Sequence, residues 1–296
     1  MLSIIIASVD KVQLQNISEN IAATVGVPYE IIATENSGAQ KGICQIYNEG
    51  IDKAKYDILC FIHEDIHIKT DGWGNILAAL FTDPQLGLVG VAGAAYLPIS
   101  PSTGGGVNSN AVYMNILQSF KFQDKETVHD YLNPRNEKLS EVAYADGVWL
   151  CTTKKVAAQF KFDVETCPGF HGYDVDFSLA VGTKYKVAVT FEILINHFSE
   201  GNFDRTWMED NIRVFSKWNS RLPLNIEKLT LAQSYRVERL TFKRFIELLL
   251  VFKLPVSLAF NILWKNNTFL RYNAILFLRL NFFILKKISA FNKNQS

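Results

Sequence analysis

The 296-residue sequence has little cysteine, and none of it is spaced for metal or redox chemistry. The four cysteines are Cys44, Cys60, Cys151 and Cys167, and no two of them form a C-x-x-C pair. We therefore expect neither a zinc knuckle nor a dithiol redox site. Cysteines that lie among apolar residues, as Cys44 and Cys60 do, are typical of a reduced, cytosolic protein.

The sequence also lacks the glycine motifs that hold bare phosphate. The segment after the first apolar run reads Ala7-Ser8-Val9-Asp10, which contains no glycine. This excludes a dinucleotide-binding G-x-G-x-x-G turn and a P-loop at that position. The first eleven residues have no basic region and too few apolar residues for a signal peptide, so we expect a buried strand there.

The net charge of +1 hides a division of the chain. Residues 232–296 carry 11 Lys and Arg against 2 Asp and Glu, which gives +9, while the preceding residues carry 19 against 27, which gives −8. Segments of opposite sign suggest two tasks. The hydrophobic content of 48% and the charged content of 20% exclude a disordered or fibrous protein.

The first hundred residues alternate between strand and helix patterns. Short apolar runs predict strands, and apolar residues spaced by three or four predict the helices between them. The predicted strands are Leu2–Ser8, Tyr29–Thr34, Ile58–His63 and Gly87–Ala95. Such alternation is typical of a parallel α/β sheet, on which ligands bind at the carboxyl ends of the strands. Those ends are polar here: Ser8, Glu35-Asn36 and His63-Glu64-Asp65.

The third strand is followed by a dense cluster of side chains that can bind a metal. His63, Glu64, Asp65 and His67 lie within five positions. Carboxylates with one or two imidazoles suit Mg²⁺ or Mn²⁺, and a divalent cation would bridge these acids to the phosphates of a nucleotide. The alternative is a solvated turn whose carboxylates cap the next helix.

Four segments resemble family 2 glycosyltransferases. Glu30–Ser37 resembles the "VDNGS" turn, Tyr47–Ala54 the "RNxGixxA" helix and Phe61–Ile66 the "FLDDD" strand end. The "HED" spelling of His63–Asp65 is similar to a bacterial branch of family 2-like sugar transferases. Gly169–Phe177 resembles the "GEDxDL" motif, with Tyr173 in place of its Glu. The resemblance covers roughly residues 1 to 220.

The resemblance implies a GT-A fold, which is a mixed α/β sheet flanked by helices, together with a nucleotide-sugar donor and Mn²⁺ or Mg²⁺. Asp65 matches the metal-binding acid. His63 replaces the family's first Asp, so it would contact ribose or phosphate, and Glu64 is the alternative. The residues that would hold the nucleoside are Ser8 and Glu35, with Asn36 and Asn48 as further contacts.

The resemblance implies acceptor-side roles for the second half of the chain. Asp146 would face the acceptor or the donor sugar, although an Asp-Gly turn is the plain alternative. Asp174 would be the catalytic base of an inverting enzyme, with Asp176 as the alternative. Asp174 and Asp176 are two positions apart and cannot share a helix face, so one can cap the helix while the other faces a cleft. His197, at the end of a strand, is either structural or a ligand of the metal or diphosphate.

Two segments leave their interpretation open. The glycine-rich segment 100–110, with Gly104, Gly105 and Gly106, reads as a surface loop or a mobile lid. The basic, apolar segment Phe242–Ile288 predicts amphipathic helices on an anionic membrane surface. The alternatives are a helical cap on the catalytic domain or a homo-oligomer contact. Its longest apolar stretches are short or interrupted by charge, and its apolar density argues against nucleic acid.

The sequence thus predicts a metal-dependent, inverting glycosyltransferase of the hexosyltransferase class. It would move a sugar from a nucleotide-diphosphate donor, a UDP-sugar first, to a glycan or lipid-linked oligosaccharide in surface polysaccharide synthesis. We predict a catalytic domain over 1–225, with a donor half (1–95) and an acceptor half (96–225), and an extension over 226–296. The expected place is cytoplasmic, on the inner face of the membrane. A non-catalytic sugar-binding or scaffold module and a nucleotidyltransferase remain as alternatives.

Overall fold

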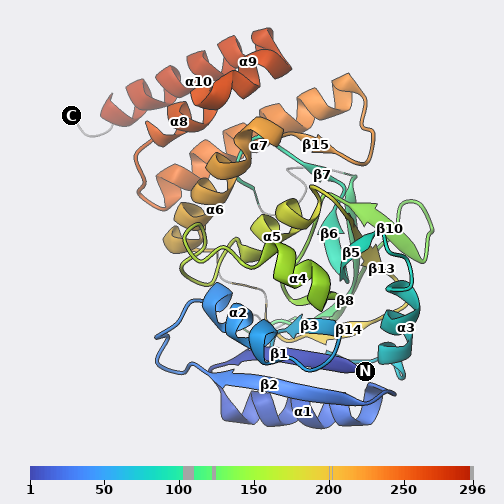
Figure 1. Ribbon diagram of the computed structural model, residues 1–296. Coiled ribbons are helices and arrows are strands. Elements are labelled where there is room, and N and C mark those ends of the chain that lie inside the picture. Colours follow the sequence, from blue (N-terminus) through green and yellow to red (C-terminus); the bar gives the residue numbers. More distant parts are fainter. Residues whose placement is uncertain (103–109, 122–124, 200, 202, 294–296) are drawn as a thin grey trace.

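A computed structural model of the chain describes residues 1–102, 110–121, 125–199, 201 and 203–293 (Figure 1). The side chains of 290–293 are outside this description. The three glycines of the segment 104–106 also lie outside the described residues. The order of strands and helices follows the predicted alternation as far as residue 62, after which consecutive strands occur without a helix between them.

The first units form because apolar stripes bury one face of each helix against the sheet. Asp10 accepts hydrogen bonds from the Val12 and Gln13 amides and so begins α1 (Lys11–Thr24), whose Ile17 and Ile21 are buried. Helix α2 (Ile43–Lys53) buries its own stripe on the same sheet, and Gly50 lies close to Ile5 of the first strand. A side chain at Gly50 would overlap Ile5, so the helix needs glycine there.

The main sheet is mixed, with seven strands in the described residues. Its strands in spatial order are β10 (Leu139–Val142), β13 (Lys186–Thr190), β5 (Leu86–Gly90), β12 (Trp149–Thr153), β3 (Ile58–Ile62), β1 (Leu2–Ser8) and β2 (Tyr29–Glu35). Strand β1 is parallel to both β2 and β3, whereas β12 runs antiparallel to β3 and β5. The register pairs Ser8 with Glu35 and Ile6 with Ile62, so the carboxyl ends of β1, β2 and β3 meet.

The described residues also form a second sheet of mixed strand direction. It contains β11 (Tyr144–Ala145), β6 (Ala92–Ala94), β8 (Val112–Gln118), β14 (Ile195–His197) and β4 (Ile66–Ile68), with β9 (Val128–Leu132) beside β8. A short pair joins β15 (Leu224–Asn225) to β7 (Tyr96–Leu97). The single strand predicted over Gly87–Ala95 is wrong, because the chain leaves the main sheet after Gly90 and enters the second sheet at Ala92.

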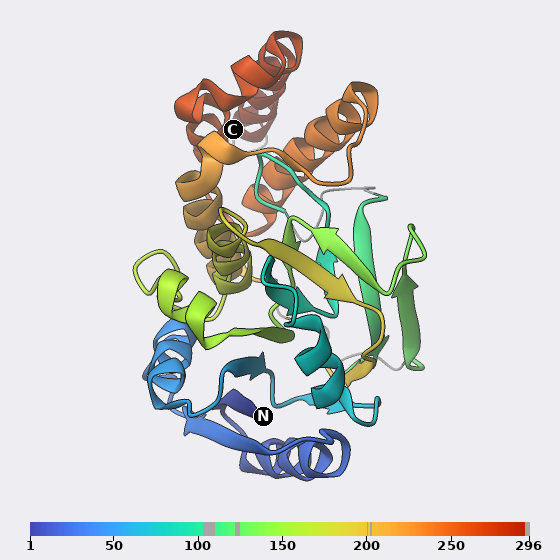
Figure 2. The same ribbon diagram turned by 45° about the vertical axis from the view of Figure 1, so that its right-hand side comes forward.

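The remaining helices cover the sheets and then build a layer of their own. Those beside the sheets are α3 (Trp73–Leu80), α4 (Lys154–Phe160), α5 (Tyr173–Val181) and α6 (Arg205–Trp218). We call α7 (Leu231–Val251), α8 (Leu258–Trp264), α9 (Thr268–Tyr272) and α10 (Ala274–Lys293) the C-terminal layer. Both views place this layer at the end of the molecule opposite α1 (Figures 1 and 2). Its Phe242, Phe245 and Leu276 belong to the same hydrophobic core as residues of α2 and α5.

The fold class agrees with the expectation of a mixed α/β sheet flanked by helices and followed by a helical extension. Of the helices that the structure describes, none is both long enough and apolar enough to cross a bilayer. The division of the chain at residue 225 stays a prediction.

Candidate metal and carboxylate sites

The carboxyl ends of β1 and β3 open into a cavity of about 370 Å³, which we call the metal cavity. Strand β3 ends at Ile62, and the His63 amide donates a hydrogen bond to the Val148 carbonyl. This fixes the turn between β3 and β4, and His63 and Asp65 both line the cavity. The location is the one that the topology of a parallel sheet segment favours for a ligand.

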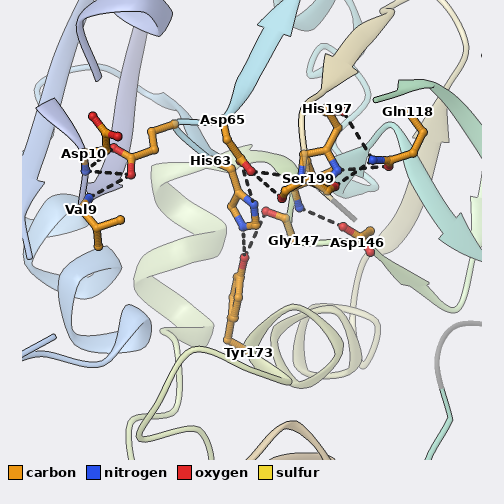
Figure 3. A network of polar contacts seen from close by, with 12 residues as sticks. Val9, Asp10, His63, Asp65, Gln118, Asp146, Gly147, Tyr173, His197 and Ser199 are labelled. Carbon is orange, nitrogen blue, oxygen red and sulfur yellow. Dashed lines mark hydrogen bonds and ion pairs between the residues drawn. The ribbon is translucent and has the colours of Figure 1, made fainter. Parts of the chain in front are cut away.

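Three side chains converge beside this cavity from two parts of the chain. His63 and Asp65 come from the β3–β4 turn, and His197 ends β14, which pairs with β4 (Figure 3). His63 Nδ1 lies 3.8 Å from Asp65 Oδ1, and His197 Nε2 lies 3.7 Å from Asp65 Oδ2. One donor atom from each of the three residues lies within 4.8 Å of the others. We call His63, Asp65 and His197 the metal cluster.

Tyr173 determines which nitrogen of His63 carries the proton. The Tyr173 hydroxyl donates to the Gly147 carbonyl at 3.1 Å and lies 3.0 Å from His63 Nε2. A phenol has one proton, so His63 Nε2 is the donor in the second bond. His63 is then the Nε2–H tautomer, and the lone pair of Nδ1 faces Asp65 (Figure 3).

Gln118 fixes the tautomer of His197 in the same manner. The Gln118 amide nitrogen donates to the carbonyls of Ser119 and Ser199, which leaves its oxygen toward His197 Nδ1 at 3.3 Å. His197 Nδ1 therefore carries the proton, and Nε2 faces Asp65 as a lone pair. Metal-ligating histidines commonly have their second nitrogen fixed by such a bond.

Asp65 is held as a carboxylate between the two imidazoles. Burial works to raise the pKa of Asp65, but attraction to the imidazolium forms of His63 and His197, together with the Ser199 hydroxyl, outweighs burial and lowers that pKa. The Ser199 hydroxyl donates to Asp65 Oδ2 at 2.6 Å. One carboxylate and two oriented imidazole lone pairs form a donor set that fits a divalent transition-metal ion better than Mg²⁺, which prefers oxygen.

Glu64 lies between the two cluster residues of the turn and also lines the metal cavity, but its carboxylate bonds the neighbouring loop. It accepts hydrogen bonds from the Val9 amide at 2.9 Å and from the Asp10 amide at 3.1 Å. It thereby fixes the loop after β1 against the turn after β3. The structure assigns Glu64 a positioning contact with this loop.

The four residues expected to hold a nucleoside occupy different places. Ser8 is buried at the end of β1, and Glu35 at the end of β2 is exposed and pairs with Lys11. Asn36 closes a turn through the Lys41 backbone, and Asn48 bonds both backbone groups of Phe162. Ser8, Glu35 and Asn36 thus lie together at the carboxyl ends of β1 and β2. Asn48 instead joins α2 to the segment after α4.

A second cavity, of about 260 Å³, contains the predicted base. We call it the carboxylate cavity; Asp146 and Asp174 line it, with Trp207 and Asn211 from α6. Asp174 Oδ2 accepts a hydrogen bond from the Gly147 amide at 3.1 Å. Burial, and then the charge of Asp146, raise the pKa of Asp174 to about 7. Asp146 itself accepts a bond from the Val148 amide, as in an Asp-Gly turn.

The structure places Asp176 away from both cavities. Its carboxylate is buried, pairs with Lys217 at 2.7 Å and accepts a bond from Trp218 Nε1 at 2.7 Å. The prediction that Asp174 or Asp176 caps the helix is wrong, because Gly172 occupies the N-cap position of α5 and no side chain caps it. Gly172 has φ of 75°, which glycine adopts without strain.

Sequence reasoning missed the supporting residues of the metal cluster. In the sequence, Tyr173 is visible only as a departure from a family motif, and none of the family-like motifs contains Gln118 or Ser199. Tyr173 follows Gly172 and precedes Asp174, so one helix start supplies a contact to each cavity. An alternating polar residue at the end of an apolar strand was the available signal for Gln118.

Comparisons with known proteins identify the family of this chain and structures with a similar fold. The model of a glycosyltransferase-like family matches residues 3–219. No curated protein matches the chain. Among solved structures, A197 from STIV is 14% identical over 67% of this chain and 86% of its own, with a TM-score of 0.40. GalNAc-T7, solved with UDP, GalNAc and Mn²⁺, is 11% identical over 86% of this chain and 58% of its own (TM-score 0.49).

A third solved structure is S. aureus TarS 1–349 in complex with UDP-GlcNAc. It is 11% identical over 85% of this chain and 73% of its own, with a TM-score of 0.45. The family match includes both cavities and every residue of the metal cluster, and it spans well over half of the sequence. The chain therefore belongs to the glycosyltransferase-like family.

Proposed function

We propose that this chain is a divalent-metal-dependent, inverting glycosyltransferase that uses a nucleoside-diphosphate sugar, with a UDP-sugar as the first donor to test. The acceptor is a hydroxyl of a glycan or of a lipid-linked oligosaccharide in surface polysaccharide synthesis. The observation that carries the proposal is the metal cluster, in which Tyr173 and Gln118 orient two imidazoles toward one carboxylate.

The two departures from the family pattern support an enzyme rather than a non-catalytic relative. His63 replaces an Asp and Tyr173 replaces a Glu, and these two residues bond each other beside the cavity. A paired change that yields an oriented ligand is what a working metal site requires. For Mn²⁺ and Mg²⁺, the two imidazoles favour Mn²⁺. The role expected of His63 toward ribose or phosphate is accordingly replaced, in this proposal, by metal ligation.

The proposed chemistry divides between the two cavities. A divalent cation, when bound, neutralises the charge that develops on the leaving diphosphate. Asp174 accepts the proton of the acceptor hydroxyl while that oxygen bonds to the anomeric carbon and the bond from this carbon to the diphosphate breaks. A base with a pKa of about 7 suits this task near neutral pH, because it is both partly ionised and basic enough. Asp146 faces the same cavity and raises the basicity of Asp174.

Thermal stabilisation by ligands tests the donor site directly. We would measure the melting temperature with UDP, GDP, ADP and CMP, each with Mn²⁺, Mg²⁺ or EDTA. A ligand at a hundred times its dissociation constant adds about 2.7 kcal/mol of stability. We expect one nucleoside diphosphate to stabilise the protein with Mn²⁺ and not with EDTA. No stabilisation by any nucleotide would contradict the proposal and favour a scaffold.

Product analysis separates the remaining classes of enzyme. A glycosyltransferase hydrolyses its donor slowly in the absence of acceptor and releases a nucleoside diphosphate, whereas a nucleotidyltransferase releases pyrophosphate. We expect Mn²⁺-dependent release of UDP from a UDP-sugar. Donor binding without any hydrolysis or transfer would favour the binding-module alternative.

A further inference from the structure

The C-terminal layer has two apolar faces, and only one of them packs on the core. In α10 the buried residues are Leu276, Phe277, Leu280 and Ile284. On the opposite side Ile275, Leu278, Phe282 and Leu285 are exposed, with Leu278 at 66% and Phe282 at 72% of their full area. At 100° per residue these four side chains fall within one narrow arc of the helix. We call them the α10 stripe.

Neighbouring exposed apolar side chains extend the stripe. Trp264, at the end of α8, packs against Phe277 with ring centroids 4.9 Å apart and donates to Asn281 Oδ1 at 3.0 Å. Leu270 of α9 is also exposed, immediately before α10. At the C-terminal end of α10, Ile288 lines an apolar hollow of about 470 Å³ with Leu254 and Val256. Exposed apolar patches of this kind on a protein surface commonly mark an interaction site.

Taken together, helices α8, α9 and α10 carry basic residues and no acidic ones. No Asp or Glu follows Glu247, whereas the same stretch of sequence contains seven Lys and Arg residues. Arg279 and Lys286 are exposed on α10 and fall beside the stripe on the helical wheel, and Arg271 is exposed at its beginning. An apolar stripe with a basic border is the pattern of a helix that lies in the interface of an anionic bilayer.

We infer that the α10 stripe is a membrane-docking surface that takes an anionic phospholipid bilayer, with Phe282, Leu278 and Trp264 in the acyl–headgroup boundary and Arg271, Arg279 and Lys286 on the headgroups. A second copy of the chain fits this surface less well, because stripe-to-stripe pairing would bring two acid-free basic borders together. The inference does not depend on the sugar-transfer reaction.

This surface refines the expectation from sequence. The sequence predicts that the segment Phe242–Ile288 lies on a membrane, with a cap on the catalytic domain or a homo-oligomer contact as the alternatives. The structure divides those roles between faces: α7 and the inner face of α10 join the hydrophobic core, and the outer face of α10 is exposed. The inner face thus packs on the core, and the outer face is the proposed membrane surface.

Vesicle flotation of the full chain tests the inference. We would use vesicles of phosphatidylcholine alone and vesicles with 30% phosphatidylglycerol, without nucleotide or metal. We expect the protein to float with the anionic vesicles and to stay largely in the bottom fraction with neutral ones. Raising the salt concentration should weaken flotation, since screening reduces the attraction between basic side chains and headgroups.

Two pairs of variants separate the apolar and basic contributions. Leu278→Ser with Phe282→Ser should lower partitioning about tenfold or more, and Val12→Ser, at an exposed apolar position of α1, should not change it. Arg271→Gln with Lys286→Gln should lower partitioning about tenfold on anionic vesicles, and Lys155→Gln on α4 should not. Circular dichroism melts confirm that each variant is folded, which the exposure of these side chains favours.

Three results would overturn the inference. The first is wild-type protein that stays at the bottom of the gradient with anionic vesicles at low salt. The second is flotation that the stripe variants do not reduce. The third is a stable dimer in light scattering that Phe282→Ser dissociates, because a second copy would then be the partner of the stripe.

Discussion

The metal cavity and the carboxylate cavity each contain an aspartate that matches a family motif, and their surroundings drive the two pKa values apart. Burial works to raise the pKa of both. At Asp65 the charges of His63 and His197 overcome it and the pKa falls. At Asp174 the charge of Asp146 adds to burial, and the pKa rises to about 7. The two carboxylates thus differ in pKa because their neighbours differ in charge.

Tyr173 lies between the two cavities and contacts both sides. Its hydroxyl bonds His63 on one side and the Gly147 carbonyl on the other, while the Gly147 amide bonds Asp174. The side chain also packs edge-on against Tyr47 in the hydrophobic core. A rigid aromatic anchor of this kind holds the spacing between a metal ligand and the proposed base.

Removal of the metal-cluster carboxylate should have the largest effect. We expect Asp65→Ala to reduce donor hydrolysis and transfer to the level seen with EDTA, because the two imidazoles are left without the anionic ligand. Isothermal titration with Mn²⁺ measures the loss of binding independently of turnover. Asp71→Ala, at an exposed aspartate after β4, is the matched control and should behave as wild type. Wild-type turnover of Asp65→Ala would contradict the metal assignment.

Substitution of the proposed base should abolish transfer and spare the metal site. Asp174→Asn keeps an acceptor for the Gly147 amide but cannot take up a proton. We expect transfer to fall about 10²–10⁴-fold, the usual contribution of a general base. Mn²⁺ and nucleotide affinity, measured by titration, should stay within about twofold of wild type. Near-normal transfer by Asp174→Asn would show that another residue is the base.

Loss of the connecting hydroxyl should weaken metal binding by an intermediate amount. In Tyr173→Phe, His63 loses the acceptor that holds its proton on Nε2. Outer-shell changes of this type typically cost about 10–100-fold in metal affinity. Electron paramagnetic resonance of Mn²⁺ reports the affinity, and ¹⁵N spectra of the imidazole report the tautomer. Tyr185→Phe, remote from both cavities, is the control. If the His63 tautomer and the Mn²⁺ affinity were unchanged, Tyr173 would have no part in metal binding.

The pH dependence of transfer should reveal the influence of Asp146. The base is active as a carboxylate, so kcat/KM should rise with pH and level off above about 7. Asp146→Asn removes the like charge while keeping an acceptor for the Val148 amide. The pKa of Asp174 should then fall, and the rising limb should move to lower pH, with a gain of a few-fold at pH 6. If the rising limb of the kcat/KM profile did not move in Asp146→Asn, Asp146 would not influence the pKa of the base.

The fold class could be predicted from the sequence, and so could the strand ends at which the candidate site residues lie, for identifiable reasons. Strands β1, β2 and β3 are apolar along nearly their whole length, and polar residues follow each of them, so strand ends could be located. The switch of sheets at Val91 and the contacts of Gln118 and Tyr173 could not be predicted. These depend on β8, β14 and α5 meeting in space, although they are far apart in the chain.

The structure places the contacts of Asp176 and Glu64, two residues that the sequence offered as alternatives, for a different reason in each case. Asp176 follows Asp174 by two positions, and only the helix direction decides that it meets Lys217 and Trp218 instead of a cavity. Glu64 follows His63 in a turn, and only the turn geometry sends its carboxylate to the loop after β1. In each case the order of the motifs located the segment, and the backbone conformation determined what each side chain contacts.

The smallest expected effect concerns stability and again distinguishes the two aspartates. The folded pKa of Asp174 is raised to about 7, so folding favours its protonated form. The stability that this proton contributes is complete below the ordinary pKa near 4 and is lost as the pH rises through 7.

Asp174→Asn, which cannot ionise, should therefore raise the melting temperature by about 2–4 °C at pH 8 and leave it unchanged at pH 4. Asp65→Asn should not be stabilised at pH 8, because the pKa of Asp65 is lowered and its ionised form is the favoured one. If the two variants gave the same melting profile from pH 4 to 8, the opposite surroundings of the two carboxylates would not be expressed in the folded protein, and the division between a metal ligand and a base would lose its physical basis.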